Sequence, residues 1–313
     1  MSQNDTNSEE RQHFIRIYVI FTVIGFPIFC SNALLFFTIL RHQALRRRKE
    51  FILIGTLAFV DSQTYGTIVV IIGVHRLWLL LTGLSTESVS RFSCFAAVHM
   101  SQFYFFYSLG CMMLVVLSID RFLSVHLGLR YLKLTANYAK CMVAAPTAIA
   151  LLEWCVLGYR SFTSETKVAR LCLGDGALQP QDYAYFFLKC TACVLLSQVL
   201  YIGVLISYKS QSSNDGSEQN AAKLYWQRRL TKSVSISCLC TFIFHVLPLF
   251  GANALTAWPQ LHRLLITYMY IINSLSPLFY LIIYTTNQQD IRKGFWALLA
   301  CKTLPGNLSL WHS

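Results

Sequence analysis

An acidic and a basic residue stand side by side at the end of one long apolar stretch. Asp120 and Arg121 follow the apolar run 109–119, and apolar residues resume behind them. Charges at the edge of a hydrophobic segment are costly, so the two side chains must pair internally or reach water. The pair is therefore a hypothesis for a functional site. The alternative is that Arg121 simply extends to the lipid headgroups.

Other ionisable side chains lie within apolar stretches and need partners there. Asp61, Glu153 and His245 are such groups, and they are the ones that a secondary transporter or channel would use. For Asp61, a structural polar contact between helices accounts for the residue as well as a functional role does. His99, His245 and His262 lack the paired spacing of a metal site, as would be needed by a membrane hydrolase. We expect no metal, no cofactor and no catalytic residue.

The composition places the chain in a membrane. Of its 313 residues, 55% are hydrophobic and 13% are charged, and the mean hydropathy is +0.49. At about 20 residues per crossing, the apolar stretches provide roughly seven helices. The net charge of +12 is carried by short segments between the apolar stretches. Membrane topology explains this charge better than binding to nucleic acid does.

We therefore expect an all-α membrane protein, a seven-transmembrane helix bundle with a short amphipathic eighth helix. The bundle should cover residues 14–285, after an N-terminal segment of residues 1–13. The expected spans are residues 14–40, 51–75, 91–125, 138–159, 183–208, 230–257 and 262–284. Residues 288–301 should form an interfacial helix, followed by a tail of residues 302–313.

The distribution of Lys and Arg sets the orientation. The run Arg41, Arg46, Arg47, Arg48 and Lys49 directly follows the first span, and the other connections expected on the same side are also rich in cations. This bias predicts an extracellular N-terminus and a cytoplasmic C-terminus for a multi-pass protein of the plasma membrane.

Three kinds of modification are expected from this topology. Asn4 begins an Asn-Asp-Thr glycosylation acceptor on the outer side, although a chance match explains it nearly as well. Cys301, at the end of the amphipathic segment, is a candidate for palmitoylation. Most of the 11 cysteines lie inside apolar spans, but Cys94 and Cys172 lie in polar surroundings on the outer side, where a disulfide persists.

The motifs resemble those of rhodopsin-like (class A) G-protein-coupled receptors. Asp120-Arg121-Phe122, followed by Gly128 and Tyr131, is similar to Asp-Arg-Tyr and the later Pro-Leu-x-Tyr of that family. Asn32 and the Leu-Ala-x-x-Asp ending at Asp61 match polar positions of its first and second helices.

The later helices carry the same resemblance with departures. The stretch from Phe242 to Pro248 is similar to the Phe…Cys-Trp-x-Pro kink, with Val246 in place of Trp. The stretch from Ser276 to Tyr280 is similar to Asn-Pro-x-x-Tyr, with Ser in place of Asn. Together with a fifth span that lacks proline, these departures resemble the nematode serpentine chemoreceptors of the Srsx type.

The resemblance implies a receptor that converts binding of an extracellular ligand into activation of a heterotrimeric G protein by outward movement of the sixth helix. Its other partners would be membrane lipids. It implies a G-protein switch, a sixth-helix hinge, a polar core and a disulfide. The switch residues would be Asp120, Arg121, Pro277 and Tyr280, and the hinge residues Phe242 and Pro248. The polar core would consist of Asn32, Asp61 and Asn273, and the disulfide would join Cys94 to Cys172.

A ligand cavity is expected between the outer halves of the third, sixth and seventh spans. Counting along the helices at 3.6 residues per turn selects the lining residues. They are His99, Phe103, Tyr104, Tyr107, Phe250, Asn253, Ile266 and Tyr270. A packed core would look similar. The outer half of the third span has no carboxylate, which argues against an amine ligand and favours a small neutral or lipidic molecule or a peptide tip.

Overall fold

The structure is a computed structural model, and the chain within it divides into two compact units. The described residues are 3–127, 129–172, 174–212, 235–236, 239–247 and 271–302. Unit 1 comprises Met1–Cys30, Val60–Gly110 and Thr147–Cys190. Unit 2 comprises Ser31–Phe59, Cys111–Pro146 and Thr191–Ser313.

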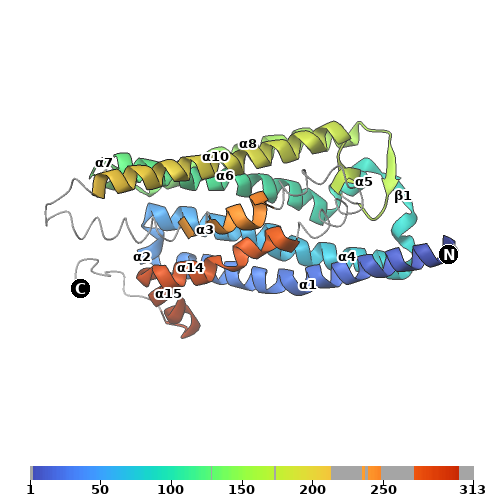
Figure 1. The fold of residues 1–313 in the computed structure, drawn as a ribbon, viewed down its shortest axis with the longest axis horizontal. Coiled ribbons are helices and arrows are strands. Elements are labelled where there is room, and N and C mark those ends of the chain that lie inside the picture. The colour runs from blue at the N-terminus through green and yellow to red at the C-terminus, as the bar shows by residue number, and fades with distance from the viewer. Residues whose placement is uncertain are drawn as a thin grey trace. The chain divides into compact units, whose positions relative to one another are not determined.

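The described residues contain five helices that are long and apolar enough to cross a membrane. They are α1 (Gln3–Arg41), the continuous run of α3 (Lys49–Asp61), η1 (Ser62–Thr67) and α4 (Ile68–Thr82), then α6 (Val98–His126), α8 (Ala136–Phe162) and α10 (Pro180–Ser212) (Figure 1). They correspond to the first five expected spans. The expected sixth and seventh spans fall largely outside the described residues, although the turn η4 (Phe242–Val246) and residues 271–278 are helical.

Several helices extend further than hydropathy predicts. The first begins at Gln3 rather than near residue 14, because residues 3–13 contain no Gly or Pro and Arg11 donates to the carbonyl of Leu80 at 2.8 Å. The second continues past residue 75 to Thr82, where Gly83 adopts a left-handed conformation with φ 77°. Glycine does this without steric cost and so ends the helix.

The expected third span is divided at its outer end. The short helix α5 (Arg91–Ala96) and the long helix α6 are separated by Ala97, whose ψ of 127° is not helical. Just before α5, β1 (Ser88–Ser90) pairs antiparallel with β2 (Lys167–Ala169), after the turn η2 (Leu84–Thr86). This small sheet departs from the all-α expectation. A further short helix, α9 (Gly174–Ala177), follows β2.

Small residues allow close packing within unit 1. A Cβ on Gly66 would lie 2.6 Å from the Cα of Phe29, and one on Gly73 would lie 2.3 Å from the hydroxyl oxygen of Thr22. Gly66 belongs to the π-helical turn η1, in which the Thr64 hydroxyl donates to the Val60 carbonyl at 2.9 Å. Such back-bonding bends helices.

Within unit 2, the last described helix is anchored to the connection that follows α1. The helix α14 (Tyr280–Asn287) is followed by α15 (Gln289–Leu299). Arg48, after α2 (Gln43–Arg46), donates to Asp290 at 2.8 Å. A Cβ on Gly294 would meet Thr38 and Leu45 at 3.1 Å, so glycine permits α15 to lie close to α1 and α2. The helix lies within the expected eighth helix, and its interfacial placement stays a prediction.

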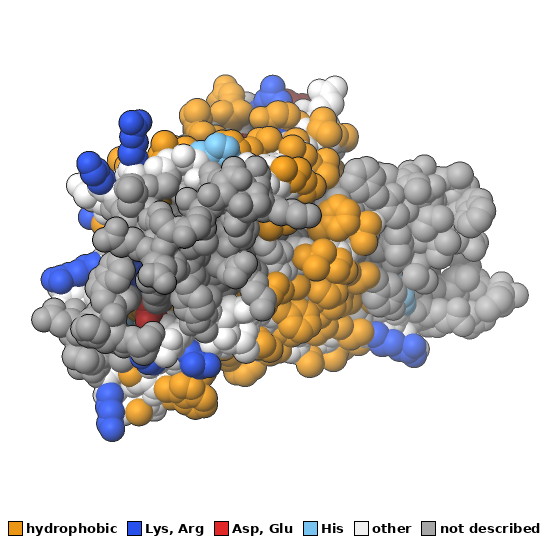
Figure 2. Space-filling view, turned by 60° about the vertical axis from the view of Figure 1, so that its left-hand side comes forward, with side chains coloured by type: hydrophobic (Ala, Val, Ile, Leu, Met, Phe, Trp, Pro, Cys, Tyr) orange, Lys and Arg blue, Asp and Glu red, His pale blue; other side chains and the backbone are white. Residues whose placement is uncertain are grey.

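Many large apolar side chains are exposed on the long helices. Val23 on α1, Leu152 on α8 and Leu188 on α10 are 65%, 68% and 71% exposed. Figure 2 shows broad areas of such side chains on one face. A soluble protein rarely exposes continuous apolar surface of this kind, whereas lipid tails cover it without cost.

Candidate functional site

Asp120 and Arg121 form a buried cluster with Tyr131 in unit 2. Their side chains are 0% and 3% exposed, and the Arg121 guanidinium pairs with the Asp120 carboxylate. The Tyr131 hydroxyl donates to the other Asp120 oxygen at 2.8 Å, and Arg121 donates to the hydroxyl oxygen at 3.2 Å. The pair is therefore internal, and Arg121 does not extend to the surface of the described residues.

Tyr131 is held in place by a second cation. It lies on the short helix α7 (Leu129–Leu132), which follows α6. The Lys49 ammonium lies 3.7 Å from the centre of the Tyr131 ring and donates to the carbonyls of Tyr131 and Leu134. Burial raises the pKa of the Tyr131 hydroxyl, so it keeps its proton and remains a donor to Asp120.

Neither partner was among the predicted switch residues. Tyr131 was recognised only as part of the motif, although its fixed spacing from Arg121 was the signal that could have placed it. Lys49 was interpreted as a marker of the cytoplasmic side, and nothing in its neighbourhood in the sequence indicates that it reaches Tyr131.

The other predicted switch residues lie in a second polar cluster of unit 2. The Tyr280 and Ser276 hydroxyl oxygens lie 3.2 Å and 3.4 Å from the Thr241 hydroxyl oxygen. The Asn32 amide donates to the Pro277 carbonyl at 3.1 Å, which joins α1 to the helical residues 271–278. Of the predicted hinge, Phe242 begins the π-helical turn η4, and Pro248 lies outside the described residues.

The residues of the predicted polar core are all buried. Asn32 and Asn273 both lie in unit 2 and are 0% and 5% exposed. Asp61 lies in unit 1 at the end of α3, and one of its carboxylate oxygens has no hydrogen-bond partner among the described residues. Its association with Asn32 and Asn273 stays a prediction.

The predicted pocket residues on α6 lie in an aromatic cluster of unit 1. Tyr104 is 1% exposed and packs edge-on against Phe186, with ring centres 5.1 Å apart. Tyr107 stacks on Phe103 at 5.2 Å and approaches Tyr65 at 6.4 Å. The remaining predicted lining residues lie outside the described residues, except His99. They are Phe250, Asn253, Ile266 and Tyr270.

Glu153 has a partner that the sequence did not reveal. Within unit 1, the Lys189 ammonium pairs with Glu153 and donates to the Ser108 hydroxyl at 2.6 Å. Ser108 in turn donates to the same Glu153 oxygen at 2.6 Å. The triad joins α6, α8 and α10. Lys189 was not singled out, although it also lies within an apolar stretch, and its partner depends on which helices are neighbours.

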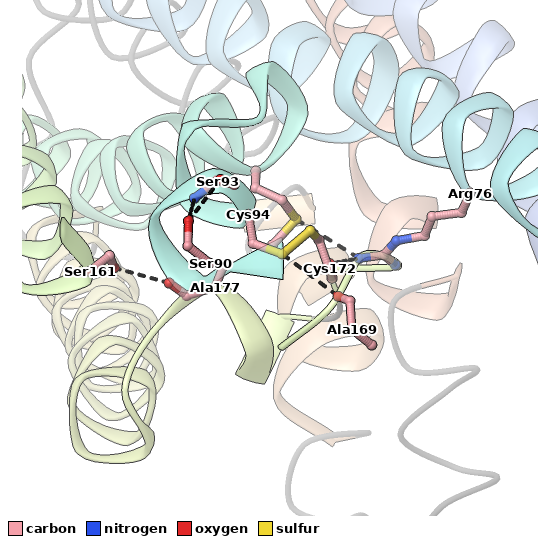
Figure 3. Close-up of a disulfide and its surroundings, with 9 residues drawn as sticks. Arg76, Ser90, Ser93, Cys94, Ser161, Ala169, Cys172 and Ala177 are labelled. Atoms are coloured by element: carbon pink, nitrogen blue, oxygen red, sulfur yellow. Dashed lines mark hydrogen bonds between the residues drawn. A yellow bond between two sulfur atoms is a disulfide. The ribbon is translucent and has the colours of Figure 1, made fainter. Parts of the chain in front are cut away.

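The predicted disulfide is present. Cys94 on α5 is bonded to Cys172, with Cα atoms 5.3 Å apart (Figure 3). The Arg76 side chain reaches the same loop and donates to the Cys172 carbonyl at 2.6 Å. The bond therefore ties the start of the third span to the loop after α8.

The modification and metal predictions remain as they stood. Cys301 is exposed just after α15, as a palmitoylated cysteine would need to be, and Asn4 lies in the first turns of α1. Among the described residues, no group of three or more His, Cys, Asp or Glu side chains is placed to hold a metal ion.

The chain was also compared with known protein families. The family model described as serpentine-type 7TM GPCR chemoreceptor Srsx matches residues 10–299, which include all five long helices, both polar clusters and the disulfide. No curated protein is similar enough to count as a match. The family consists of membrane-spanning receptors and not of enzymes. Because the match covers most of the sequence, the chain belongs to the Srsx family of serpentine-type seven-transmembrane chemoreceptors.

Proposed function

We propose that the protein is a plasma-membrane receptor that converts binding of an extracellular ligand into activation of a heterotrimeric G protein. The N-terminus lies outside and the C-terminus inside, as the distribution of cations indicates. The ligand is a chemosensory small molecule or a peptide, bound between the outer halves of the third, sixth and seventh helices.

The observation that carries the proposal is the closed cluster of Asp120, Arg121 and Tyr131. Arg121 is an obligate cation, and here its charge is neutralised by a carboxylate and capped by a hydroxyl. We infer that the buried guanidinium has a second arrangement, in which it leaves Asp120 and reaches a partner protein. A ligand produces that change only if it binds the second arrangement more tightly than the first.

The second cluster supports a moving sixth helix. The hydroxyl oxygen of Thr241, next to the π-helical turn η4, lies 3.4 Å from that of Ser276 and 3.2 Å from that of Tyr280. Single π-helical turns interrupt the regular hydrogen-bond ladder and are frequent at functional sites. Pro248 follows in the sequence, and a proline within a helix removes a backbone hydrogen bond. In the outward movement that we propose, the hydroxyl contacts of Thr241 with Ser276 and Tyr280 would break.

The decisive experiment places the purified receptor in liposomes and measures two quantities. We expect ligand-stimulated nucleotide exchange on an added G protein and no ion flux. Flux that requires Asp61 or Glu153, without nucleotide exchange, would favour the transporter or channel that these residues could also serve.

Arg121→Ala tests the switch itself. We expect it to abolish stimulated nucleotide exchange while the receptor still binds ligand at the outer side. Arg130→Ala is the matched control, because Arg130 is an exposed cation only a few positions away. Full coupling by Arg121→Ala would show that the pair is structural only. Arg121→Lys, which keeps the charge but loses the planar fork, provides a second reading if the alanine variant expresses poorly.

A further inference from the structure

Three polar side chains at one place in unit 1 each have a buried nitrogen without a hydrogen-bond partner among the described residues. Arg76 is 8% exposed and His99 is 3% exposed. The rings of His75 and His99 are in contact, with centres 4.7 Å apart. Arg76 follows His75 in α4, and its guanidinium lies 3.8 Å from the sulfur of Met100, which follows His99 in α6. The three therefore form one cluster, which we call the Arg76 cluster.

One nitrogen on each residue of the Arg76 cluster lacks a hydrogen-bond partner among the described residues. Arg76 Nε, His75 Nδ1 and His99 Nε2 are buried and have no hydrogen-bond partner among the described residues. Buried polar groups are nearly always satisfied, so each exception requires an explanation. One terminal nitrogen of Arg76 donates to the Cys172 carbonyl (Figure 3), which orients the guanidinium.

Among the described residues, no counter-ion compensates the charge of Arg76. The carboxylates that form ion pairs in unit 1 are taken by other cations: Asp182 by Arg160, Glu87 by Arg170 and Glu153 by Lys189. Within the described residues, Arg76 contacts no carboxylate. A buried cation that lacks a counter-ion is strongly unfavourable. An anion that entered the cluster would supply both the missing charge and the missing acceptors.

We propose that the Arg76 cluster binds the carboxylate of an acidic small-molecule ligand. The planar guanidinium offers parallel N–H donors that match the two oxygens of a carboxylate. An imidazole nitrogen that carries its proton donates a further hydrogen bond. Aromatic side chains lie next to the cluster: the Tyr18 ring centre is 5.6 Å from the Arg76 guanidinium carbon, and the Trp78 and His75 ring centres are 6.4 Å apart. The rest of the ligand is therefore apolar or aromatic. This names the ligand class and rests on the proposed receptor function.

The assignment changes the expectation for the ligand. The absence of a carboxylate in the outer half of the third helix argues against amines but says nothing about acids. Nothing in the sequence around Arg76 marks it as a ligand-binding residue. Its proximity to His99 becomes apparent only when α4 and α6 are placed side by side.

The test uses the purified full-length receptor in detergent and matched pairs of probes. Acetate, hexanoate, benzoate and phenylacetate are each compared with the corresponding amide, and the measured quantity is the shift in apparent melting temperature. We expect at least one acid to stabilise the receptor more than its amide. Losing a charge-assisted hydrogen bond costs enough that Arg76→Gln should weaken that acid's binding on the order of 10- to 100-fold. His99→Gln should weaken it less.

Arg91→Gln is the matched control, since Arg91 is also a buried arginine of unit 1 that donates to a loop carbonyl, that of Leu178. A purely structural role for Arg76 would lower the melting temperature in both variants and leave the preference for acid over amide unchanged. If Arg76→Gln does not fold, His99→Gln and Arg76→Lys carry the test.

Three outcomes would overturn the assignment. They are no preference for any acid in the wild-type receptor, a preference that survives Arg76→Gln or its substitutes, and stabilisation by inorganic phosphate alone. Because the measurement needs no G protein, its failure is distinct from failure of the proposed function. Acid binding without nucleotide exchange would leave this site intact and reject the coupling.

Discussion

The Tyr131 hydroxyl donates a hydrogen bond to the Asp120 carboxylate at 2.8 Å, although Asp120 lies on α6 and Tyr131 on the following helix, α7. Two side chains therefore hold Asp120. One is Arg121, which is next to it in the sequence, and the other is Tyr131, which the chain after α6 brings back to it. The connection between the third and fourth long helices thus contributes a residue to the cluster that we propose as the switch.

Removing this hydroxyl should raise basal activity. Tyr131→Phe keeps the ring that Lys49 covers but leaves one Asp120 oxygen without its donor. An unsatisfied buried acceptor costs about 1–3 kcal/mol, which weakens the closed arrangement relative to the other. We expect ligand-independent nucleotide exchange to increase at equal receptor amount. Tyr159→Phe, at a position that is 70% exposed, should change nothing. Unchanged or reduced basal exchange in Tyr131→Phe would remove the hydroxyl from the switch.

The ion pair in unit 1 should show strong coupling between its members. Glu153→Gln leaves the Lys189 ammonium partly buried without its carboxylate, and Lys189→Gln leaves the carboxylate alone. Breaking a buried pair from one side costs roughly 3–5 kcal/mol, more than replacing both groups together. The double variant should therefore have a higher apparent melting temperature than the sum of the single effects predicts. Additive effects would show that the two side chains do not stabilise each other.

The close approach of α1 to η1 should make Gly66 intolerant of substitution. A methyl group on Gly66 would lie 2.6 Å from the Cα of Phe29, which is backbone and cannot rotate away. We expect Gly66→Ala to lower the apparent melting temperature and the amount of folded receptor. Gly203→Ala is the control, since no described atom lies within 4 Å of the new methyl group. In a helix interior, that change should stabilise by roughly 0.5–1 kcal/mol. Equal tolerance at both positions would contradict this packing.

Neighbouring aromatic residues of α6 should separate core from pocket. Tyr104 is 1% exposed and packs against Phe95 and Phe186, so Tyr104→Ala should cost about 3–5 kcal/mol and reduce expression. Phe103 is only partly buried, so Phe103→Ala should leave expression near normal and shift the dose–response curve of an activating ligand to higher concentration. Unaltered potency in a well-expressed Phe103→Ala receptor would refute the predicted lining.

Sequence reasoning reached the membrane class and the motifs because these depend on local pattern. A stretch of apolar residues must be helical in lipid whatever surrounds it, since its backbone groups find no other partners there. The order of Asn32, Asp61, Asp120-Arg121, Pro277 and Tyr280 was enough for the family, which the match over residues 10–299 confirms. The Cys94–Cys172 pairing followed from the same resemblance, and the bond is present.

The helix boundaries were less predictable, because hydropathy records where lipid begins and not where a helix ends. The ends depend on local stops and on contacts beyond the membrane. Gly83 stops α4, and the contact of Arg11 with Leu80 supports the early start of α1.

By itself, the sequence determined that the chain is a multi-pass helical receptor with a charge pair at the end of its third long helix. Only the tertiary structure decided which partner each buried charge has. Lys189 pairs with Glu153, Lys49 covers Tyr131, and Arg76 lies beside Met100, with no carboxylate partner among the described residues. These partners come from different helices, so they depend on how the helices are packed and rotated. Spacing along one helix carries information about that helix alone, whereas the two members of a buried ion pair such as Glu153 and Lys189 lie on different helices.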